Sequence, residues 1–267
     1  MKKNEANSLL PPIMVVVLCS IIVSIVLAFF NAWFATIPLG CCIIIFLIAP
    51  FFSRWGFFLP VISRGNTGKD VVAITFDDGP DPVTTIPLLQ LLEKYNMKAT
   101  FFVTGEKANK NGNLIRKIIE KKHAIGNHSY RHNPLLMLSS TKRLFEEIEL
   151  TQNVLKKYNI IPYAFRPPVG ITNPKLGPIL RKMGMYCVTF SCRGFDGGNR
   201  YINGLAEKIL KKVKPDDIII FHDIQPKGKT SVDLWLREID LVLSGLRKKK
   251  LTVIALHELI GKSVMNC

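Results

Sequence analysis

A long stretch without charge constrains this chain more than any other feature of its sequence. No charged residue occurs between Glu5 and Arg54, and the stretch contains two apolar runs, about residues 13–30 and 37–52. A helix of roughly 20 apolar residues spans the hydrocarbon core of a bilayer. We therefore expect residues 1–65 to form a membrane anchor of two spanning helices.

The turn between the two runs and their aromatic flanks fit a helical hairpin. Asn31 interrupts the apolar sequence, and Trp33 and Trp55 stand where interfacial aromatic residues are enriched. A cleaved signal peptide fits less well, because the apolar region is too long and Ala32–Ala35 is a poor cleavage site. The expected anchor is an integral hairpin with its turn near residues 31–35.

Basic residues flank the expected hairpin on both sides. Lys2 and Lys3 precede it, and Arg54, Arg64 and Lys69 follow it. Lys and Arg are enriched in the cytoplasmic flanks of membrane spans, and two spans return the chain to the side where it began. We expect a protein of the inner or plasma membrane with its larger domain in the cytoplasm, whereas a single span would put that domain outside.

Charge and cysteine content exclude two other classes of function. The net charge is +16, but the basic residues are scattered along helices, as at Lys117, Lys121 and Lys122, without the interleaved aromatic residues of a nucleic-acid site. The expected partner of this charge is an anionic membrane surface, and we expect no nucleic-acid partner. The six cysteines include no CxxC pair, so we expect small buried apolar residues rather than a disulfide framework or a zinc–thiolate site.

Residues 66–267 alternate strand-like and helix-like segments, which is typical of a parallel sheet. We expect an α/β domain, a distorted (β/α) barrel of about seven units that is closed or nearly closed rather than an open sheet, because no two-half dinucleotide pattern and no GxGxxG motif occurs. The expected strands span residues 71–76, 98–103, 123–128, 163–167, 186–190, 217–222 and 251–256, and the expected helices span residues 85–95, 113–122, 141–158, 175–183, 202–213 and 231–250.

Two adjacent carboxylates, Asp77 and Asp78, follow the first expected strand. A Gly-Pro turn comes next, so both lie at the carboxyl end of the strand, where α/β folds place their chemistry. An Asx-type turn explains the same residues without a function. Adjacent carboxylates repel, so a nearby cation is needed to keep both ionised. The other strand ends decide between the two interpretations.

Polar side chains also follow the later strands. His128 and His132 are four residues apart, which puts both rings on one face if the segment is helical and suits two imidazole ligands of one metal ion. Arg166 follows another strand, the Gly-rich segment 191–198 follows the next, and His222 ends a later one. A capping His pair, a solvated Arg, a turn or a core histidine explains each alone. Because all of these clusters are expected at one rim of the sheet, together they favour an active site.

Four motifs along this rim occur in a fixed order: TFDDGP at residues 75–80, HSYRH at 128–132, RPPVG at 166–170 and FHD at 221–223. They resemble the motifs of the NodB-like polysaccharide deacetylases, carbohydrate esterase family 4, over almost all of residues 70–257. Each motif alone is a weak signal, but four in order are specific. The resemblance implies a distorted (β/α) barrel and a divalent metal, usually zinc.

The resemblance assigns three metal ligands and a catalytic set by position. Asp78, His128 and His132 match the Asp-His-His ligands of the metal. The positions that match the family's other roles are Asp77 (catalytic base), Arg166 (orienting the base), His222 (general acid), Asp196 (supporting carboxylate) and Val169 (backbone oxyanion contact).

Three positions depart from the family pattern. Val169 stands where members often have Tyr. The Gly-rich segment 191–198 carries Arg193 and Gly197 where the family usually has an Asp and a Trp. A Trp wall of the sugar groove is therefore missing, and a cation replaces an anion at a position that contacts substrate. An extra cation beside a membrane hairpin suits an anionic, phosphate-linked saccharide.

These features predict a metal-dependent hydrolase of carbon–nitrogen bonds. The expected reaction removes an N-acetyl or N-formyl group from an amino sugar of a membrane-proximal or lipid-linked glycan. An externally facing N-deacetylase of peptidoglycan is the alternative enzyme. A membrane protein that binds glycan without catalysis is the alternative of another class, and the intact set of chemically essential residues disfavours it.

Overall fold

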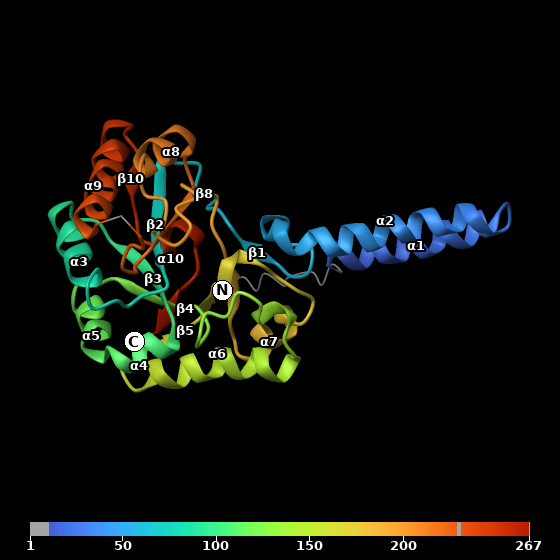
Figure 1. Cartoon of the computed structure of the whole chain (residues 1–267), viewed down its shortest axis with the longest axis horizontal. Helices are drawn as coiled ribbons and strands as arrows, with labels where there is room; N and C mark the ends of the chain where they lie inside the picture. The colour runs from blue at the N-terminus through green and yellow to red at the C-terminus, as the bar shows by residue number, and fades with distance from the viewer. Residues whose placement is uncertain (1–10, 229–230, 267) are drawn as a thin grey trace, which may run out of the picture.

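The protein has two parts, a rod-like helical hairpin and a globular α/β domain (Figure 1). The structure is a computed structural model that describes residues 11–228 and 231–266. Lys2 and Lys3, one of the expected basic flanks, and Cys267 lie outside the described residues.

The hairpin consists of α1 (Pro12–Ala28) and α2 (Ala32–Ile48). Asn31 begins α2, because its side chain accepts a hydrogen bond from the backbone N–H of Trp33 at 2.9 Å. This cap starts α2 earlier than the expected second span. The 3₁₀ segment η1 (Ala49–Trp55) leads from α2 to the domain.

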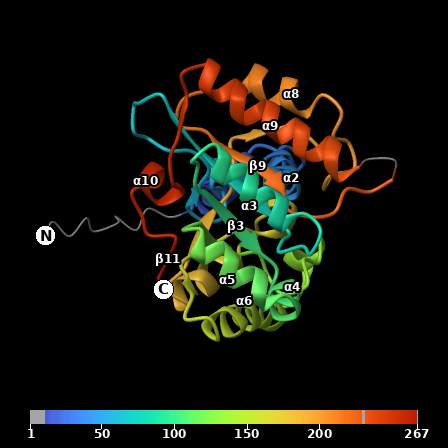
Figure 2. The same cartoon turned by 90° about the vertical axis from the view of Figure 1, so that its left-hand side faces the viewer.

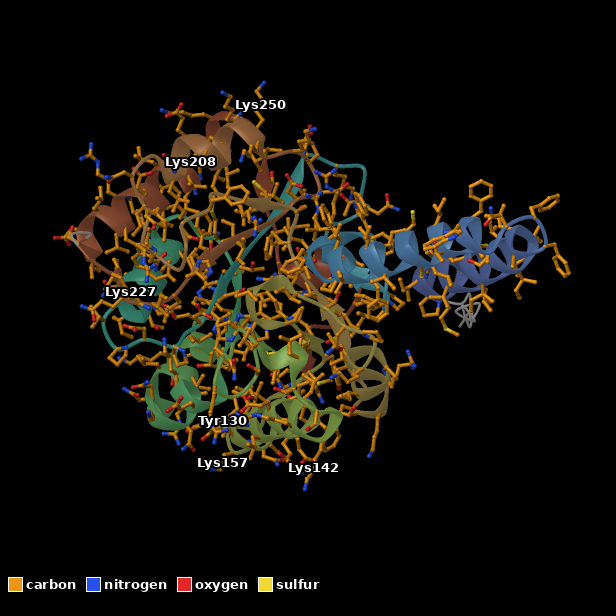
Figure 3. The ribbon with its side chains drawn as sticks, turned by 45° about the vertical axis from the view of Figure 1, so that its right-hand side comes forward. Tyr130, Lys142, Lys157, Lys208, Lys227 and Lys250 are labelled. Carbon is orange, nitrogen blue, oxygen red and sulfur yellow. The ribbon has the colours of Figure 1, made fainter. Side chains whose placement is uncertain are left out.

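The surface of the hairpin is apolar and exposed. Phe29, Phe30 and Trp33 at its turn are 86%, 80% and 80% exposed, and the lysines labelled in Figure 3 all lie on the globular part. Soluble monomers rarely expose contiguous apolar patches of more than a few hundred Å². Among the described residues one helix, Ala32–Phe52, is long and apolar enough to cross a membrane, as a membrane anchor or a signal sequence would be.

The globular domain is built on one parallel sheet. Its strands follow the order β1-β7-β6-β4-β3-β2-β9-β8, and β10 pairs with β2 at the start of that strand. The ladder between the described strands has β1 and β8 as its two edges, so the sheet is a half-barrel rather than a closed ring. The strands are β1 (Val61–Ile62), β2 (Val71–Asp77), β3 (Ala99–Val103), β4 (Ala124–Asn127), β6 (Ala164–Phe165), β7 (Tyr186–Val188), β8 (Cys192–Arg193), β9 (Ile218–His222) and β10 (Thr252–Val253).

Helices other than α10 form an outer layer around these strands (Figure 2). Ser140 begins the long helix α6 by accepting a hydrogen bond from the N–H of Arg143, and Ser231 begins α9 in the same way at Leu234. The helices are α3 (Thr85–Lys94), α4 (Gly105–Lys110), α5 (Gly112–Glu120), α6 (Thr141–Lys156), α7 (Leu176–Lys182), α8 (Leu205–Lys212), α9 (Val232–Lys248) and α10 (Leu256–Ile260).

Strand β2 separates two apolar layers by the alternation of its side chains. Val72 and Phe76 belong to the core between the sheet and the outer helices. Ala73 faces the inside of the half-barrel, where it shares a smaller core with Phe102 and with Leu256 of α10. The same alternation puts Asp77 on the inner face, at the carboxyl end of the strand.

Several short elements were not predicted from the sequence. These are β1, β8, α4, α10, the 3₁₀ segments η1, η2 (Leu136–Leu138) and η3 (Pro168–Gly170), and the antiparallel pair β5 (Ile161–Pro162) and β11 (Met265–Asn266). The strands among them are two residues long, too short to carry a periodic pattern. Because β1 already pairs with β7, the sheet begins before residue 66, and the expected domain boundaries stay a prediction.

The expectation of buried cysteines is correct for part of the chain. Cys187 and Cys192 are buried in the domain, but Cys19 and Cys41 are exposed on the hairpin. The expectation is wrong for these two because the apolar helices that carry them are not covered by protein.

Candidate active site

Strand register brings the predicted residues together at one rim of the sheet. Asp77 pairs with His222 in the β2–β9 ladder. Asn127 pairs with Phe165 in the β4–β6 ladder, so His128 and Arg166 leave their strands side by side. The carboxyl ends of parallel strands thus meet as expected.

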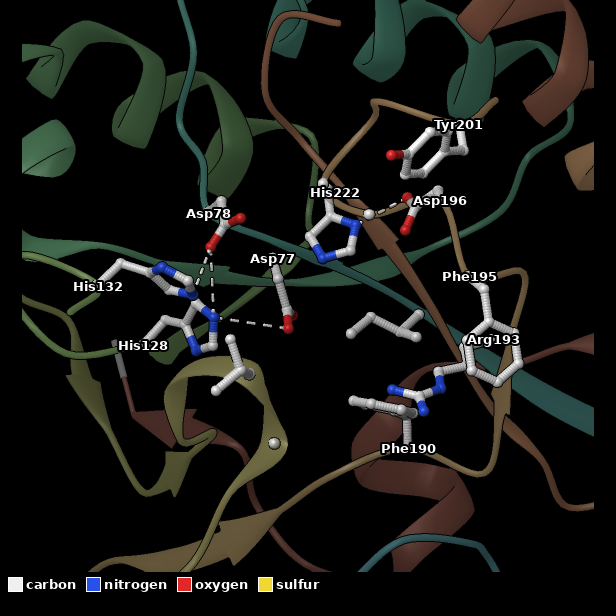
Figure 4. A pocket seen from close by; sticks show the side chains of 15 residues that line it. Asp77, Asp78, His128, His132, Phe190, Arg193, Phe195, Asp196, Tyr201 and His222 are labelled. Atoms are coloured by element: carbon white, nitrogen blue, oxygen red, sulfur yellow. Dashed lines mark hydrogen bonds and ion pairs between the residues drawn. The ribbon is translucent and has the colours of Figure 1, made fainter. Parts of the chain in front are cut away.

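The backbone at Asp78 points the two adjacent carboxylates in different directions. Asp78 has a φ of 71°, in the left-handed region that Asp tolerates better than most residues. As Figure 4 shows, its carboxylate is turned toward His128 and His132, whereas Asp77 lies lower in the cavity. The Asx-turn interpretation therefore explains the backbone but not where the two side chains point.

Asp78, His128 and His132 form a compact cluster that fits a divalent metal ion. One ligand atom from each lies within 4.8 Å of the others. Asp78 Oδ1 is 3.4 Å from His128 Nε2 and 3.1 Å from His132 Nε2. That oxygen is buried, and it has no hydrogen-bond partner among the described residues. A buried carboxylate oxygen that faces two imidazole nitrogens is suited to share a cation with them.

The protonation of the two histidines agrees with this donor set. His128 Nδ1 is 2.7 Å from the carbonyl oxygen of Arg166, so Nδ1 donates and the lone pair of neutral His128 is on Nε2, toward Asp78. Burial lowers the pKa of His132 to about 4, so its imidazole is neutral near pH 7. Burial works against the imidazolium of His128, but the charges of Asp77 and Asp78 outweigh it and raise the pKa of His128, so without a metal ion these two carboxylates favour a cation at this position. Two imidazole nitrogens and one carboxylate are a typical zinc donor set once the nitrogens facing the ion are deprotonated.

The segment that carries both histidines is not a helix, so the helical basis for their common face is wrong. Ser129 and His132 have φ angles of 64° and 52°, which fold the loop back on itself. The Ser129 hydroxyl accepts a hydrogen bond from the N–H of His132 at 3.2 Å. The ring centroids of His128 and His132 are 4.8 Å apart, so a loop achieves the convergence expected of a helical turn.

Arg166 lies behind Asp77, outside the lining of the cavity, and fixes the position of its carboxylate. The Arg166 side chain is fully buried, and its Nη1 donates to Asp77 Oδ1 at 2.6 Å and to the Thr75 hydroxyl at 2.8 Å. Its guanidinium stacks on the ring of Phe102 at 3.9 Å. Burial lowers the pKa of Arg166 and the charge of Asp77 offsets part of this effect, so the guanidinium remains a cation.

His222 and Asp196 form a second charged pair across the cavity. His222 Nδ1 is 2.7 Å from Asp196 Oδ2. Burial disfavours the imidazolium, but the hydrogen bond and charge of Asp196 outweigh it and raise the pKa of His222 to about 9. His222 is therefore protonated at neutral pH, with Nε2 as its second donor.

All of these groups meet at one cavity of about 430 Å³. Eight of the nine predicted site residues line it, and the ninth, Arg166, lies behind Asp77. Val169 lines it with a φ of 52°, which is strained for a β-branched residue. The lining residues are Asp77, Asp78, His128, His132, Val169, Gly170, Phe190, Arg193, Phe195, Asp196, Gly197, Gly198, Tyr201, Ile220 and His222.

Sequence reasoning missed the aromatic residues of this cavity. Phe190, Phe195 and Tyr201 line it in the region where the family's Trp is absent. Their positions depend on the path of the loop after β7, so their only sequence signal was closeness to the Gly-rich segment. The cavity therefore has an aromatic surface, although the Trp that is usual in the family is absent.

Asp223 of the FHD motif does not line the cavity. It is fully buried and accepts hydrogen bonds from the hydroxyls of Thr84 and Thr85 at 2.8 and 2.6 Å. Burial raises the pKa of Asp223 to about 7. These hydrogen bonds connect the end of β9 to the start of α3, so Asp223 has a structural role.

Comparison with known proteins identifies the family. A profile of the polysaccharide deacetylases matches residues 64–188. A peptidoglycan-N-acetylglucosamine deacetylase of Bacillus cereus is 30% identical over 194 residues, which cover 72% of this chain and 89% of that protein. The chain belongs to the polysaccharide deacetylase family. This membership confirms the family that the four motifs indicated and the predicted enzyme class, a hydrolase of the N-acetyl amide bonds of sugars.

Other polysaccharide deacetylases share the fold or part of the sequence. Peptidoglycan-N-acetylglucosamine deacetylase PgdA of Listeria monocytogenes is 29% identical over 207 residues, but the chain spans only 42% of its length. The solved structure of the Bc1960 peptidoglycan N-acetylglucosamine deacetylase has a TM-score of 0.68 at 27% identity, covering 76% of this chain and 94% of that one.

The fold also occurs in a protein described as inactive. A carbohydrate esterase family 4 pseudoenzyme of Bacillus anthracis has a TM-score of 0.67 at 21% identity, covering 75% of this chain and 68% of that one. At that identity the likeness concerns the fold alone. Catalysis on this fold therefore depends on the residues of the site.

Proposed function

We propose that this chain is a membrane-anchored, metal-dependent hydrolase that removes an N-acetyl or N-formyl group from an amino sugar of a membrane-proximal or lipid-linked glycan. The observation that carries the proposal is the arrangement around one cavity. Asp77, fixed by Arg166, faces the cluster of Asp78, His128 and His132, and His222 lies on the other side.

The three clustered side chains are the proposed metal ligands, and zinc is the proposed ion. When bound there, a divalent ion supplies a Lewis acid that acidifies a water molecule and polarises the scissile carbonyl. Asp78 contributes one buried carboxylate oxygen, and the hydrogen bond from His128 Nδ1 to the Arg166 carbonyl fixes the orientation of that ring.

Asp77 is the proposed general base. Its Oδ1 is occupied by Arg166, whereas Oδ2 lies 3.6 Å from His128 Nε2, beside the proposed ligands. Oδ2 is therefore the atom that accepts the proton of the attacking water. The buried Arg166 guanidinium places a permanent positive charge against Oδ1 and leaves Oδ2 free for this role.

His222 is the proposed general acid, with Asp196 as its supporting carboxylate. Because Asp196 accepts from Nδ1, the proton on Nε2 is the one donated to the leaving amine nitrogen as the C–N bond breaks. The negative charge of Asp196 keeps the imidazolium available at neutral pH.

Val169 and Arg193 are proposed to contact the substrate. The structure gives the backbone N–H of Val169 no acceptor among the described residues, and Val169 lines the cavity. A free backbone donor beside the reacting carbonyl is suited to hold the tetrahedral oxyanion. Arg193 lines the same cavity from β8.

Acyl release by the purified full-length protein tests the proposal. We expect acetate or formate release from N-acylated amino-sugar glycans, and we expect Asp77→Asn and treatment with a chelator to abolish it. The matched control is Asp240→Asn, because Asp240 pairs with Lys94 on the outer helices. Full activity of Asp77→Asn would refute the role of Asp77.

The proposed anchor crosses the membrane twice, with both flanks and the domain in the cytoplasm. Its support is the hairpin itself: the N–H of Ile13 at the start of α1 donates to the carbonyl of Phe57 beyond η1 at 3.1 Å. The two ends of the apolar segment are therefore neighbours. Two spans place such neighbours on the same side of a bilayer.

An externally facing peptidoglycan N-deacetylase is the second candidate. It is favoured by the relatives in Bacillus cereus and Listeria monocytogenes, which are named as peptidoglycan deacetylases. Reporters fused after Lys69, one active only in the cytoplasm and one only outside it, separate the candidates. We expect cytoplasmic activity, and external activity would favour the peptidoglycan enzyme.

A further inference from the structure

A second cavity, of about 510 Å³, adjoins the active site on the side of the membrane hairpin. Its wall combines η1 at the root of the hairpin with the turn at Val169 and the segment from Thr189 to Phe195. We call it the hairpin-root cavity. Its lining residues are Phe51, Phe52, Arg54, Trp55, Val169, Gly170, Thr189, Phe190, Ser191, Cys192, Arg193, Phe195 and Lys212.

The hairpin-root cavity and the active-site cavity share a wall. Val169, Gly170, Phe190, Arg193 and Phe195 line both. Figure 4 shows the guanidinium of Arg193 between Phe190 and Phe195, on the side of the active site away from His132. A molecule held at the proposed catalytic residues therefore reaches the hairpin root past Arg193.

Among the described residues, three cations and no acidic residue line the hairpin-root cavity. The cations are Arg54, Arg193 and Lys212. Within the described part of the chain, none of the three forms an ion pair, whereas nearby Arg64 pairs with Asp217 at 2.5 Å. Like charges placed together in a partly enclosed site favour an anionic ligand.

Aromatic rings hold two of these cations in place. The guanidinium of Arg193 lies 4.2 Å from the ring centroid of Phe195, and the amine of Lys212 lies 4.8 Å from the same centroid. Stacking on a ring orients a cation without neutralising it. Both side chains therefore keep hydrogen-bond donors for a ligand such as a phosphate.

The far end of the hairpin-root cavity is apolar and continuous with the proposed membrane span. Phe51 and Trp55 are 71% and 67% exposed, and the apolar helix Ala32–Phe52 leads directly into this wall. From the proposed catalytic residues, the two cavities thus lead past three cations to an apolar surface at the proposed membrane span. A lipid-linked amino sugar has the same order of groups: sugar, phosphate, hydrocarbon chain.

We infer that the hairpin-root cavity binds the phosphate ester that links the acylated amino sugar to its lipid. Arg54, Arg193 and Lys212 contact the phosphate, and the hydrocarbon chain passes along Phe51 and Trp55 toward α2. This inference rests on the proposed function, which it narrows to substrates with a phosphate directly between sugar and lipid.

Binding of a matched pair of probes tests the inference without relying on turnover. Farnesyl monophosphate and farnesol differ only in the phosphate, and calorimetric titration into the full-length protein in detergent micelles gives a dissociation constant for each. We expect tighter binding of farnesyl monophosphate by at least tenfold, the effect of one or two charge-assisted hydrogen bonds. Equal binding of the two probes would overturn the inference.

Charge-removing variants locate the site. We expect the preference to fall by about tenfold or more in Arg193→Gln/Lys212→Gln and in Arg54→Gln. Lys211→Gln is the control, since Lys211 is exposed on the same helix as Lys212 but does not line the hairpin-root cavity. Exposed side chains are replaced, and thermal unfolding checks that each variant is folded. A preference that survives all three charge removals would also overturn the inference.

Two further arms separate the sources of phosphate. Phosphatidylglycerol in the micelles tests a membrane headgroup, and inorganic phosphate tests a free anion. We expect neither to displace farnesyl monophosphate at equal concentration, and full displacement by either would assign the hairpin-root cavity to that ligand instead. Acyl release is measured separately: release without phosphate preference retains the proposed function and rejects this inference, and preference without release does the reverse.

Discussion

Arg166 contacts two of the proposed catalytic groups at once: its guanidinium donates to Asp77 and its carbonyl accepts from His128. One residue at the end of β6 therefore fixes both the proposed base and a proposed metal ligand. Because Arg166 and Asp77 are both buried, each depends on the other for charge compensation. The site is built as a unit rather than as independent side chains.

Removing the Arg166 cation should destabilise the fold as well as the site. Arg166→Met leaves the Asp77 carboxylate buried without its partner, and breaking a buried ion pair costs about 3–5 kcal/mol. We expect chemical denaturation to show a loss of this size in the free energy of unfolding, together with loss of acyl release. Arg237→Met, at an exposed position of α9, should change stability by less than about 0.5 kcal/mol. A loss below about 1 kcal/mol in Arg166→Met would contradict the compensation argument.

Activity should fall as pH rises through the pKa of His222. The proposed acid acts as the imidazolium, and Asp196 raises the pKa of His222 to about 9 against the opposing effect of burial. The raised pKa also means that His222 contributes stability below its unfolded pKa near 6.5 that is lost as pH rises toward about 9. The alkaline limb of kcat/KM should therefore lie in the alkaline range.

Asp196→Asn isolates the cause of this limb. Without the carboxylate, burial is left as the dominant effect, and the alkaline limb should move to lower pH. At pH 8 we expect a loss of about tenfold or more in kcat/KM, because most His222 is then neutral. Asp240→Asn serves as the control for removing a carboxylate. An unshifted pH profile in Asp196→Asn would exclude Asp196 as the group that tunes His222.

The sequence predicts those parts of the fold that have a local signal. Strand β2 combines β-branched residues with a Gly-Pro stop, and its expected and observed bounds agree to one residue. The two-residue strands β1 and β8 have no such signal, because they exist only through pairing with other strands. β8 pairs with β9, and β1 pairs with β7, which is far from β1 in the sequence. For the same reason the sequence led us to expect a closed or nearly closed barrel, whereas the sheet is a half-barrel.

The candidate site divides in the same way. Motif spacing placed Asp77, Asp78 and His222 at strand ends, and parallel register then brought them together. The backbone angle at Asp78, which separates the two carboxylates, follows from tertiary contacts rather than from the pattern. The hairpin-root cavity was not predictable either, because residues far apart in the sequence, such as Arg54 and Lys212, line it together.

Metal removal should lower stability through the proposed ligands. An ion bound only by the folded state stabilises it by about 2.7 kcal/mol at a free concentration of 100 times its dissociation constant. We expect Zn²⁺ to raise the free energy of unfolding of chelator-treated protein by about this amount at that concentration, and elemental analysis to give one ion per chain. Asp78→Asn and His132→Gln should abolish the increase.

The control for metal binding is a histidine outside the cluster. His257 is 53% exposed on α10, so His257→Gln should keep both the stability increase and the metal content. Zinc retained in both Asp78→Asn and His132→Gln would show that the ion binds elsewhere.

Replacing Val169 by glycine should stabilise the protein. Val169 has a φ of 52° and is 50% exposed, so the change relieves a strain of about 1–3 kcal/mol and loses little burial. Greater freedom of glycine in the unfolded chain offsets about 0.5–1 kcal/mol of this gain. The net expectation is a rise of about 1 kcal/mol in the free energy of unfolding, within a range of about 0–2.5 kcal/mol, measured by chemical denaturation.

Val83→Gly is the matched control for this prediction. Val83 is 42% exposed and is absent from the residues with positive φ in the described chain. Glycine there gains no strain relief, so stability should fall by about 0.5–1 kcal/mol. The opposite signs of the two substitutions measure the backbone strain at the rim directly. A loss of stability in both would mean that the left-handed conformation of Val169 carries no cost, and that the rim is not held under strain.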